Sequence, residues 1–325
     1  MTKLGYQIAN FTHPGIGQAE VFANVCAQAK SADESGFDAV MVMDHFYQLP
    51  MLGDPDQIMF EAYTLLSALA QHTKKVRLGA LVTGNTYRNP AVLGKIVTTL
   101  DLVSNGRAMC NIGAGWFERE HTDFGIEFGT FTTRFEKLEE ALQILIPMLR
   151  GGQPNLAGKH YQISNVINNP APLSRVPLMI GGGGETKTLR MVAQYADLGN
   201  IGCPRGEVPR KVDVLAEHCQ RLGRDRSEIT LSWLRMALIA PTMEQARAEF
   251  GEFLETRGMG YFAMDDDAKR KVESDWVFGD PDSVAETLAN DAKLGIDGFV
   301  LSLVANGQNP ERVALLGETA TAALA

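Results

Sequence analysis

An adjacent carboxylate and imidazole, Asp44 and His45, directly follow the apolar run Val40–Met43. Side chains of these two types can donate and accept hydrogen bonds and can move protons near neutral pH. The residues around them show neither the H-E-x-x-H nor the H-x-x-E-H spacing, so we expect no metal ion here. The structural alternative is that Asp44 caps a loop while His45 only packs against its neighbours.

A second group of polar residues follows the apolar run 76–82. Thr83 and Asn85 are small or polar groups that suit a rim in contact with a planar ligand. Tyr87 and Arg88 come next and can stack on such a ligand or pair with a substrate. The alternative interpretation is an ordinary turn that leads into the next helix.

A third group begins at Gly113 and Gly115, after another apolar run. Glycines let the backbone approach a ligand closely, and Trp116 can form an apolar wall beside them. The charged stretch Glu118–His121 is more typical of a solvated, salt-bridged loop than of a catalytic cluster.

Four consecutive glycines, Gly181–Gly184, connect the apolar run Val176–Ile180 to a predicted helix. A turn without side chains lets backbone N–H groups approach an anion, and the start of a helix adds partial positive charge. We therefore expect a bound phosphate at this turn. Thr186 replaces the last glycine of the G-x-G-x-x-G fingerprint, and a tight strand-to-helix connection is the alternative.

These groups would lie close together in a fold that places the ends of its strands side by side. The chain alternates apolar runs with helical patterns, as such a fold requires. The predicted strands are 4–10, 38–43, 76–82, 106–112, 176–180, 197–201, 229–239 and 298–303. The predicted helices are 18–35, 60–72, 91–104, 132–149, 185–195, 208–222, 243–256 and one from 310. Eight such units indicate a (β/α)₈ barrel, in which chemistry sits at the carboxyl ends of the strands. That rule adds Asn10, at the end of the first strand, to the candidate pocket residues.

Two stretches interrupt the alternation of one barrel domain predicted to span residues 1–325. The insertion 151–173 is rich in Gly, Pro and Asn and includes an expected hairpin at Gly158–Ile163. The insertion 258–279 is expected to be a long loop, followed by a helix over Pro281–Leu294. Long loops of this kind are usually lids or partner contacts.

The composition of the chain restricts the kinds of partner and the cellular compartment that we expect for it. The chain of 325 residues is 45% hydrophobic and 21% charged, with a net charge of −9 and no basic tract, which disfavours a nucleic-acid surface. No apolar run reaches membrane-spanning length, and residues 1–8 lack a signal-peptide pattern, so we expect a cytoplasmic protein. The four cysteines are far apart and are interpreted as buried fillers rather than disulfides or zinc ligands.

Several motifs in the same order resemble the luciferase-like monooxygenase superfamily, most closely its deazaflavin branch, which uses coenzyme F420. The resemblance covers roughly residues 4–240 and weakens beyond them. It is carried by Asp33–Asp38 with Asp44–Phe46, Leu78–Gly84 with Tyr87–Pro90, Thr98–Arg107, Ile112–Trp116, Gly181–Glu185, Thr188–Arg190 and Ala196–Asp197.

This resemblance implies a luciferase-like (β/α)₈ barrel with a non-prolyl cis peptide between Leu81 and Val82 that supports one face of a tricyclic ring. It places Asp44 and Thr83 at the polar edge of the ring and His45 beside the reacting face. The implied cofactor contacts are Asp44, Leu81, Val82, Thr83, Asn85, Gly113, Gly181, Gly182, Gly183, Gly184, Glu185 and Thr186, with the phosphate at 182–185. Lys187 and Arg190 would assist an anionic tail, or are ordinary surface residues. Trp116, Tyr87 and Asn10 are the expected substrate-pocket residues.

The function implied is an oxidoreductase that transfers a hydride between coenzyme F420 and a small organic substrate, with His45 and Asp44 as catalytic residues. A homodimer is the assembly that the resemblance implies. An FMN-dependent monooxygenase that activates dioxygen is one alternative, and a non-catalytic flavin-binding barrel is another. A metal-dependent barrel hydrolase is disfavoured, because only one of six histidines directly follows a predicted strand. Sugar-phosphate oxidation is also disfavoured, because no lysines for a substrate phosphate can be matched.

Overall fold

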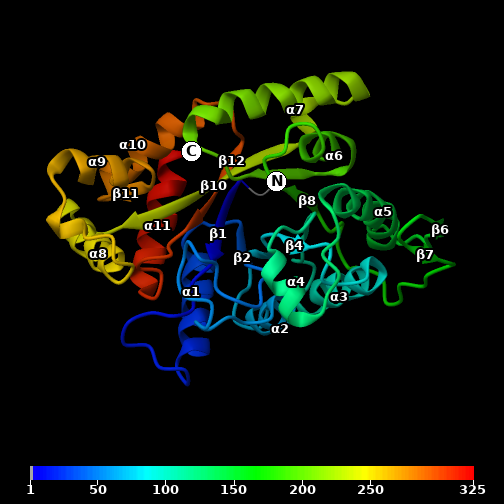
Figure 1. Ribbon diagram of the computed structural model, residues 1–325, viewed down its shortest axis with the longest axis horizontal. Coiled ribbons are helices and arrows are strands. Elements are labelled where there is room, and N and C mark those ends of the chain that lie inside the picture. The colour runs from blue at the N-terminus through cyan, green and yellow to red at the C-terminus, as the bar shows by residue number, and fades with distance from the viewer. Residues whose placement is uncertain (1–2) are drawn as a thin grey trace.

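The computed structural model describes residues 3–325 and shows parallel strands arranged as a barrel with helices outside (Figure 1). Its strands are β1 (Leu4–Ile8), β2 (Ala39–Val42), β3 (Arg77–Ala80), β4 (Thr83–Gly84), β5 (Cys110–Gly113), β8 (Leu178–Gly181), β9 (Leu198–Ile201), β10 (Thr230–Ile239) and β12 (Gly298–Ser302). The order around the sheet is β3-β2-β1-β12-β10-β9-β8-β5-β4, and a parallel bridge between Leu78 of β3 and Ala108, just before β5, closes the barrel. The predicted (β/α)₈ barrel is confirmed.

The predicted third strand, 76–82, is divided. β3 pairs with β2 and β4 pairs with β5, so the chain changes neighbours between the two segments. The Leu81–Val82 peptide bond at this step is cis, as the family resemblance implied.

Helices surround the strands and cover their outer faces. They are α1 (Val21–Glu34), α2 (Ala62–Leu69), α3 (Pro90–Val103), α5 (Phe131–Leu149), α6 (Thr188–Tyr195), α7 (Val208–Leu222), α8 (Met243–Glu255), α10 (Pro281–Ala292) and α11 (Pro310–Ala323), with short 3₁₀ turns at Arg205–Glu207 and Arg226–Glu228. α3 begins at Pro90, one residue before the predicted helix 91–104, and the Asn89 side chain accepts hydrogen bonds from the amides of Ala91 and Val92. α6 begins at Thr188, three residues later than predicted, because a turn precedes it.

The two insertions differ in how well they were predicted. The first contains the antiparallel hairpin of β6 (Leu156–Ala157) and β7 (Gln162–Ile163), as expected. The second is not a loop, and that prediction was wrong. It contains a 3₁₀ turn at Tyr261–Ala263, helix α9 (Asp266–Ser274) and β11 (Val277–Gly279), which pairs with the end of β10. These elements project from one side of the barrel beside α8 (Figure 1).

Local chemistry explains why the second insertion is ordered. Asp265 caps α9 by accepting a hydrogen bond from the amide of Ala268, and Asp266 and Asp267 place negative charge in its first turn. Val277 and Phe278 are buried because β10 is long enough to extend beyond the barrel and pair with them. The isolated pattern of 258–279 does not reveal this pairing.

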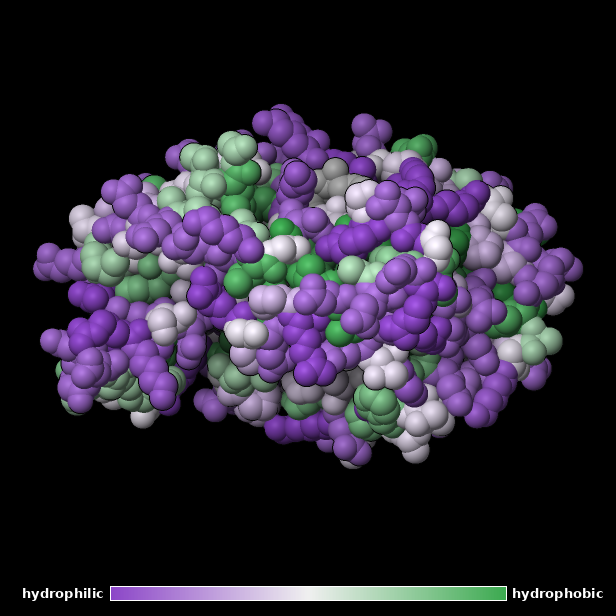
Figure 2. Space-filling view, turned by 90° about the horizontal axis from the view of Figure 1, so that it is seen from above, coloured by the Kyte–Doolittle hydropathy of each residue, from purple (hydrophilic) through white to green (hydrophobic). Residues whose placement is uncertain are grey.

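The surface and the helices give further constraints. The face shown in Figure 2 is mostly hydrophilic, and its hydrophobic residues lie in separate groups rather than in one patch. Within residues 3–325, no helix has both the length and the apolar composition needed to cross a bilayer.

His13, in the loop after β1, makes the stability of the fold depend on pH. Its side chain is 6% exposed, and burial lowers its pKa to about 4 because the imidazolium would lose hydration. Between pH 6.5 and 4 the unfolded chain binds a proton here that the folded chain does not, so stability is lost as pH falls through this window. We expect this residue to cost about 2 kcal/mol of unfolding free energy between pH 7 and pH 5.

Denaturant unfolding at both pH values measures this effect. The His13→Gln variant should lose less stability between pH 7 and pH 5 than the unmodified chain, whereas replacing exposed His72 by glutamine should change nothing. Equal losses in all three proteins would contradict the assignment.

Candidate functional site

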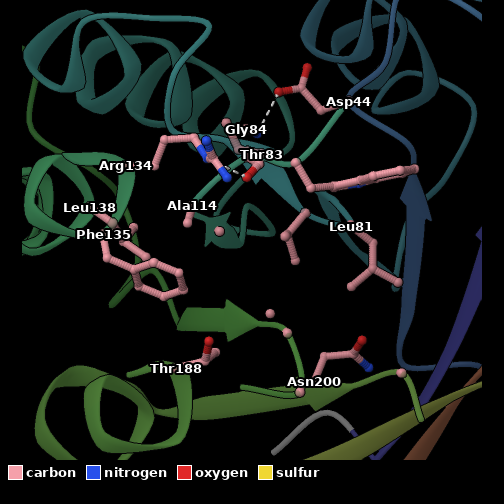
Figure 3. A pocket seen from close by; sticks show the side chains of 18 of the residues that line it. Asp44, Leu81, Thr83, Gly84, Ala114, Arg134, Phe135, Leu138, Thr188 and Asn200 are labelled. Carbon is pink, nitrogen blue, oxygen red and sulfur yellow. Dashed lines mark hydrogen bonds between the residues drawn. The ribbon is translucent and has the colours of Figure 1, made fainter. Parts of the chain in front are cut away.

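A cavity of about 530 Å³ opens at the carboxyl ends of β2, β4, β5, β8 and β9, the edge where (β/α)₈ barrels carry their chemistry. Figure 3 shows residues from distant parts of the chain facing this space, with Asp44 and Thr83 on one side and Thr188 and Asn200 opposite. Of the predicted site residues, the lining includes Asp44, His45, Leu81, Val82, Thr83, Tyr87, Gly113, Trp116, Gly181, Gly182 and Gly183.

Five predicted residues do not line this cavity. Gly184, Glu185 and Thr186 lie in the turn beyond it, and Asn85 is buried without contributing to the wall. Asn10 does not line this cavity; its side chain donates to the carbonyl oxygen of Val304 and lines a different cavity. The expected substrate contact of Asn10 in the main cavity is therefore corrected.

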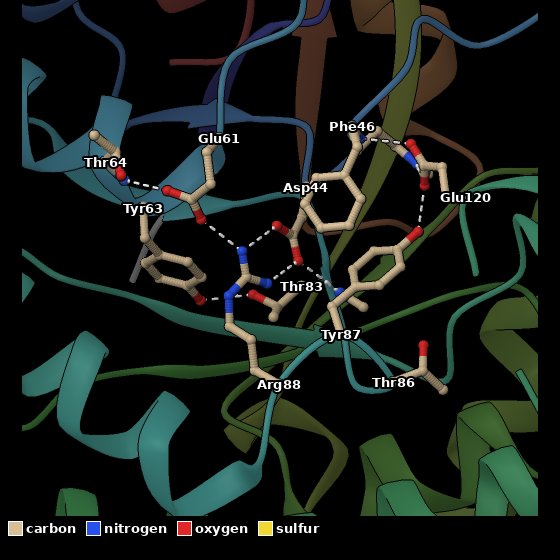
Figure 4. A network of polar contacts seen from close by, with 12 residues as sticks. Asp44, Phe46, Glu61, Tyr63, Thr64, Thr83, Thr86, Tyr87, Arg88 and Glu120 are labelled. Carbon is tan, nitrogen blue, oxygen red and sulfur yellow. Dashed lines mark hydrogen bonds and ion pairs between the residues drawn. The ribbon is translucent and has the colours of Figure 1, made fainter. Parts of the chain in front are cut away.

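Asp44 is held by Arg88, which approaches the carboxylate with both terminal nitrogens at 2.7 and 2.9 Å. Arg88 also contacts Glu61 at 2.6 Å, and the amide of Gly84 donates to Asp44 Oδ2 at 3.0 Å (Figure 4). The two carboxylates occupy the Arg88 guanidinium, so it is not available to pair with a substrate. Pairing with a substrate was one of the roles expected for it. Asp44 Oδ1, with a single partner among residues 3–325, retains capacity to accept another hydrogen bond.

Thr83 is oriented by Tyr63, whose hydroxyl oxygen lies 2.6 Å from Thr83 Oγ1. Burial raises the pKa of Tyr63, so its hydroxyl stays protonated and able to donate to the threonine. The threonine hydroxyl is then free to donate toward the cavity that it lines.

His45 is oriented by Glu120, whose carboxylate oxygen lies 2.9 Å from Nδ1. The same carboxylate accepts hydrogen bonds from the amides of Phe46 and Tyr47 and from the hydroxyl of Tyr87 (Figure 4). Among residues 3–325 no protein group bonds to His45 Nε2, which leaves that nitrogen for a ligand. The cavity therefore contains an imidazole with one nitrogen fixed by an acid.

The predicted solvated face at Glu118–His121 is found only at Glu118 and Arg119, which are exposed. These residues begin helix α4 (Glu118–Phe124), and both Glu120 and His121 are buried. Burial raises the pKa of Glu120, but hydrogen bonds from His45, Tyr87 and the loop amides outweigh it, so the pKa is lowered and the group is ionised. If this stretch had been interpreted as a helix, Glu120 would have been placed on its buried face. The segment is too short to show the hydrophobic periodicity of a helix.

Two of the predicted glycines are required by packing against Val82. A Cβ at Gly113 would lie 2.8 Å from Val82 Cγ2, and a Cβ at Gly181 would lie 2.6 Å from Val82 Cγ1. What approaches both glycines in the structure is this side chain, and their expected contact with a ligand stays a prediction. Gly182 has a φ of +130°, which favours glycine at the turn.

The rest of the turn provides hydrogen-bond donors. Within residues 3–325, the amides of Gly183, Gly184 and Glu185 donate to no protein acceptor. The Glu185 side chain is occupied by Arg210 and Lys211, at 2.8 and 2.9 Å. These free amides, next to the start of α6, are an arrangement suited to an oxyanion.

Positive charge lies on α5 and at the start of α6. Arg134 lines the cavity and donates to the carbonyl oxygens of Gly115 and Gly129, and no carboxylate of residues 3–325 pairs with it. Lys187 Nζ lies 5.2 Å above the ring of Phe131, also without a carboxylate partner in that range. Arg190, by contrast, is paired with Glu139 at 2.9 Å and is not available to an anionic tail.

Sequence reasoning did not find the α5 wall. Phe131, Phe135 and Leu138 line the cavity together with Arg134. Their spacing of three and four residues places them on one helix face, a signal that is equally typical of core packing. Trp116, which was expected, stands at the mouth and is 55% exposed.

The structure thus defines a (β/α)₈ barrel with a ligand-sized cavity at its catalytic edge, and sequence comparison identifies its family. Residues 2–298 match the luciferase-like monooxygenase family, and the chain belongs to it. An F420-dependent glucose-6-phosphate dehydrogenase of Amycolatopsis mediterranei is 31% identical over 212 residues, which are 64% of this chain and 59% of that protein. Pyrimidine monooxygenase RutA of Pseudomonas syringae is 29% identical over 231 residues, 68% of this chain and 62% of that protein.

The matched stretches thus span about six tenths of those relatives. Solved structures show the same fold over the whole chain. An F420-dependent secondary alcohol dehydrogenase superposes with a TM-score of 0.79 and 19% identity, covering 100% of this chain and 99% of that one. Monooxygenase RslO1 of Streptomyces bottropensis superposes with a TM-score of 0.82 and 18% identity, covering 99% and 100%.

Proposed function

We propose that this protein is an oxidoreductase that transfers a hydride between coenzyme F420 and a small organic substrate. The observation that supports this most directly is one cavity that combines an apolar wall at Leu81 and Val82 with a turn whose amides have no protein acceptor. A tricyclic ring with an anionic tail requires both surfaces. The F420-dependent relative at 31% identity supports the choice of cofactor.

The residues present fit such a cofactor. Leu81 and Val82 would cover one face of the ring, and Thr83 and Asp44 Oδ1 would bond to its polar edge. The amides of Gly183 and Gly184 would bind the phosphate of the tail, with positive charge from Arg134. When bound, the deazaflavin supplies or accepts the hydride, and the protein contributes position and electrostatics.

Side chains of this protein would accept or donate the proton. Glu120 accepts the hydrogen bond of His45 Nδ1, which fixes the ring and favours a proton at that position. Nε2 then accepts a proton from a substrate hydroxyl when the imidazole is neutral, or donates one to a carbonyl oxygen when it is charged.

An FMN-dependent monooxygenase is the second candidate function. It is favoured by the several pyrimidine monooxygenases that are 28–31% identical to parts of this chain. FMN also combines a tricyclic ring with a phosphate, so the same surfaces would accept it. A flavin-binding barrel without catalytic activity is the third.

Titration of the purified chain with each cofactor separates the first two. We expect coenzyme F420 to bind with a Kd of about 10 µM or lower and FMN at least tenfold more weakly, as followed by cofactor fluorescence. Anaerobic assays with a panel of alcohols and carbonyl compounds would then report the change in F420 absorbance. Tight FMN binding without F420 binding would overturn the proposal, and F420 binding without turnover of any compound would favour the non-catalytic barrel.

A further inference from the structure

The Glu120 carboxylate accepts four hydrogen bonds, two at each oxygen. Oε1 accepts from the amides of Phe46 and Tyr47 at 2.5 and 2.9 Å, and Oε2 accepts from His45 Nδ1 at 2.9 Å and from the Tyr87 hydroxyl (Figure 4). The Glu120 side chain is fully buried, so these four donors take the place of solvating water. The proton transfer proposed above uses the imidazole and leaves the phenol without a role.

Tyr87 is a donor in this contact. An ionised carboxylate can only accept, so the hydroxyl hydrogen must point at Glu120 Oε2. Burial and the adjacent carboxylate raise the pKa of Tyr87, so the phenol keeps its proton over the pH range in which imidazoles titrate. Its hydroxyl therefore shares one carboxylate oxygen with His45 at every pH of interest.

The ring of Tyr87 is held independently of its hydroxyl. Its centroid lies 4.8 Å from the ring of Phe46 and 4.8 Å from the ring of His121, on which it stacks. Both nitrogens of His121 have protein partners of their own. Gly84 leaves room for the tyrosine, since a Cβ there would lie 2.7 Å from its ring. Removal of the hydroxyl oxygen alone should thus leave the ring in place.

The other neighbours of His45 do not titrate. The rings of Trp116 and Phe117 meet the imidazole edge to face, with centroids 5.7 and 5.9 Å away. Within residues 3–325, Glu120 is the one ionised side chain that bonds to His45. The proton affinity of the imidazole consequently depends on how much negative charge this carboxylate presents to Nδ1.

Two further charged groups line the same cavity as His45. Asp44 is paired with Arg88 at 2.7 Å, and Arg134 extends from α5 without a carboxylate partner in the described part of the chain. Neither Asp44 nor Arg134 forms a hydrogen bond or ion pair with Glu120 among the described residues. The contact from the Tyr87 hydroxyl to the imidazole therefore passes through Glu120.

Two donors on one oxygen weaken each other. The phenol draws negative charge from Oε2, so less charge remains to attract the proton on His45 Nδ1. A charged imidazolium gains more from a neighbouring carboxylate than a neutral imidazole does, because its hydrogen bond is charge-assisted. Weakening that carboxylate therefore disfavours the charged form of the ring.

We infer that Tyr87 is a positioning residue that lowers the proton affinity of His45 through Glu120. The phenol thereby helps the imidazole to release a proton that it has accepted at Nε2. This catalytic consequence rests on the proposed function, because it requires a substrate proton at that nitrogen. The proton affinity itself belongs to the chain alone and is measurable without cofactor or substrate.

Titration of His45 in the full chain tests the inference. NMR of ¹⁵N-histidine-labelled protein follows the ring, and His45→Gln identifies its signal. In Tyr87→Phe the midpoint should move to higher pH by about 0.3–0.6 pH units, a two- to fourfold gain in proton affinity. Tyr195→Phe is the matched control, because its hydroxyl also lies near a glutamate, 3.4 Å from Glu139 Oε1, but outside the cavity. It should leave the midpoint unchanged.

A second substitution at the same position reverses the expected sign. Tyr87→3-fluorotyrosine keeps the ring and makes the phenol a stronger donor, so the His45 midpoint should move to lower pH. A residue that only fills space would not give shifts of opposite sign in the two variants. An unchanged midpoint in folded Tyr87→Phe, or a midpoint that does not fall with 3-fluorotyrosine, would overturn the inference.

Kinetics separate this inference from the proposed function. If both hold, the pH profile of kcat in Tyr87→Phe shifts in the same direction and by the same amount as the His45 midpoint. A shifted midpoint in a protein that turns over no substrate supports the role of Tyr87 and contradicts the proposed function. Turnover with an unshifted midpoint supports the function and contradicts the role of Tyr87.

Discussion

Replacement of His45 by alanine is expected to lower kcat by about 10²- to 10⁴-fold, the range that a positioned acid–base group contributes. The imidazole lines the cavity, one nitrogen is fixed by Glu120, and the other has no protein partner within residues 3–325. Cofactor affinity should change by less than about threefold, because the proposed contacts to the tail lie on the opposite wall. Steady-state kinetics together with a cofactor titration measure the two effects separately.

Two further variants define the role of this pair. Glu120→Gln removes the charge next to His45, so we expect the pH profile of kcat to shift as well as its maximum to fall. His160→Ala is a matched control, since His160 also lies 2.9 Å from a glutamate, Glu136, but outside the cavity. Unchanged turnover in His45→Ala would remove the residue from the mechanism.

The second large effect is on stability. Arg88→Met is expected to reduce the free energy of unfolding by about 3–5 kcal/mol, because it leaves the buried carboxylate of Asp44 without a counter-charge. Urea unfolding at pH 7 measures the loss. Arg221→Met, which breaks an exposed pair with Glu217 at 3.8 Å, should cost less than about 1 kcal/mol.

A double variant checks the cause of the loss. Adding Asp44→Asn to Arg88→Met removes the buried charge, and stability should then recover in part. If the double variant is as unstable as the sum of the two single variants, the loss comes from packing and not from the unpaired carboxylate.

The sequence predicts the barrel well because each strand and helix carries its own local pattern. It also places Asp44 and His45 correctly, since the residue after a barrel strand faces the mouth. It does not predict that Arg88 pairs with Asp44, because the tertiary fold determines which carboxylate lies next to an arginine. Glu120 was missed for a similar reason: its four hydrogen-bond partners are more than 30 residues away.

The glycines show a different limit. Gly113 and Gly181 were selected as points where a ligand approaches the backbone, but the sequence does not show that a side chain lies against them. The structure shows the Val82 side chain beside both, and the amides without a protein acceptor among residues 3–325 belong to the next residues of the turn. The second cavity, the one that Asn10 lines, is invisible in the sequence, because four separate segments form it and none carries a motif.

The carboxylate of Glu120 has one more consequence. It bonds to His45 and also to the amides of Phe46 and Tyr47, the first residues of the segment whose later part, 50–57, forms a wall of the second cavity. One side chain therefore holds both the imidazole of His45 and the start of the segment that forms this wall. Loss of this carboxylate would therefore free both the imidazole ring and the start of that segment.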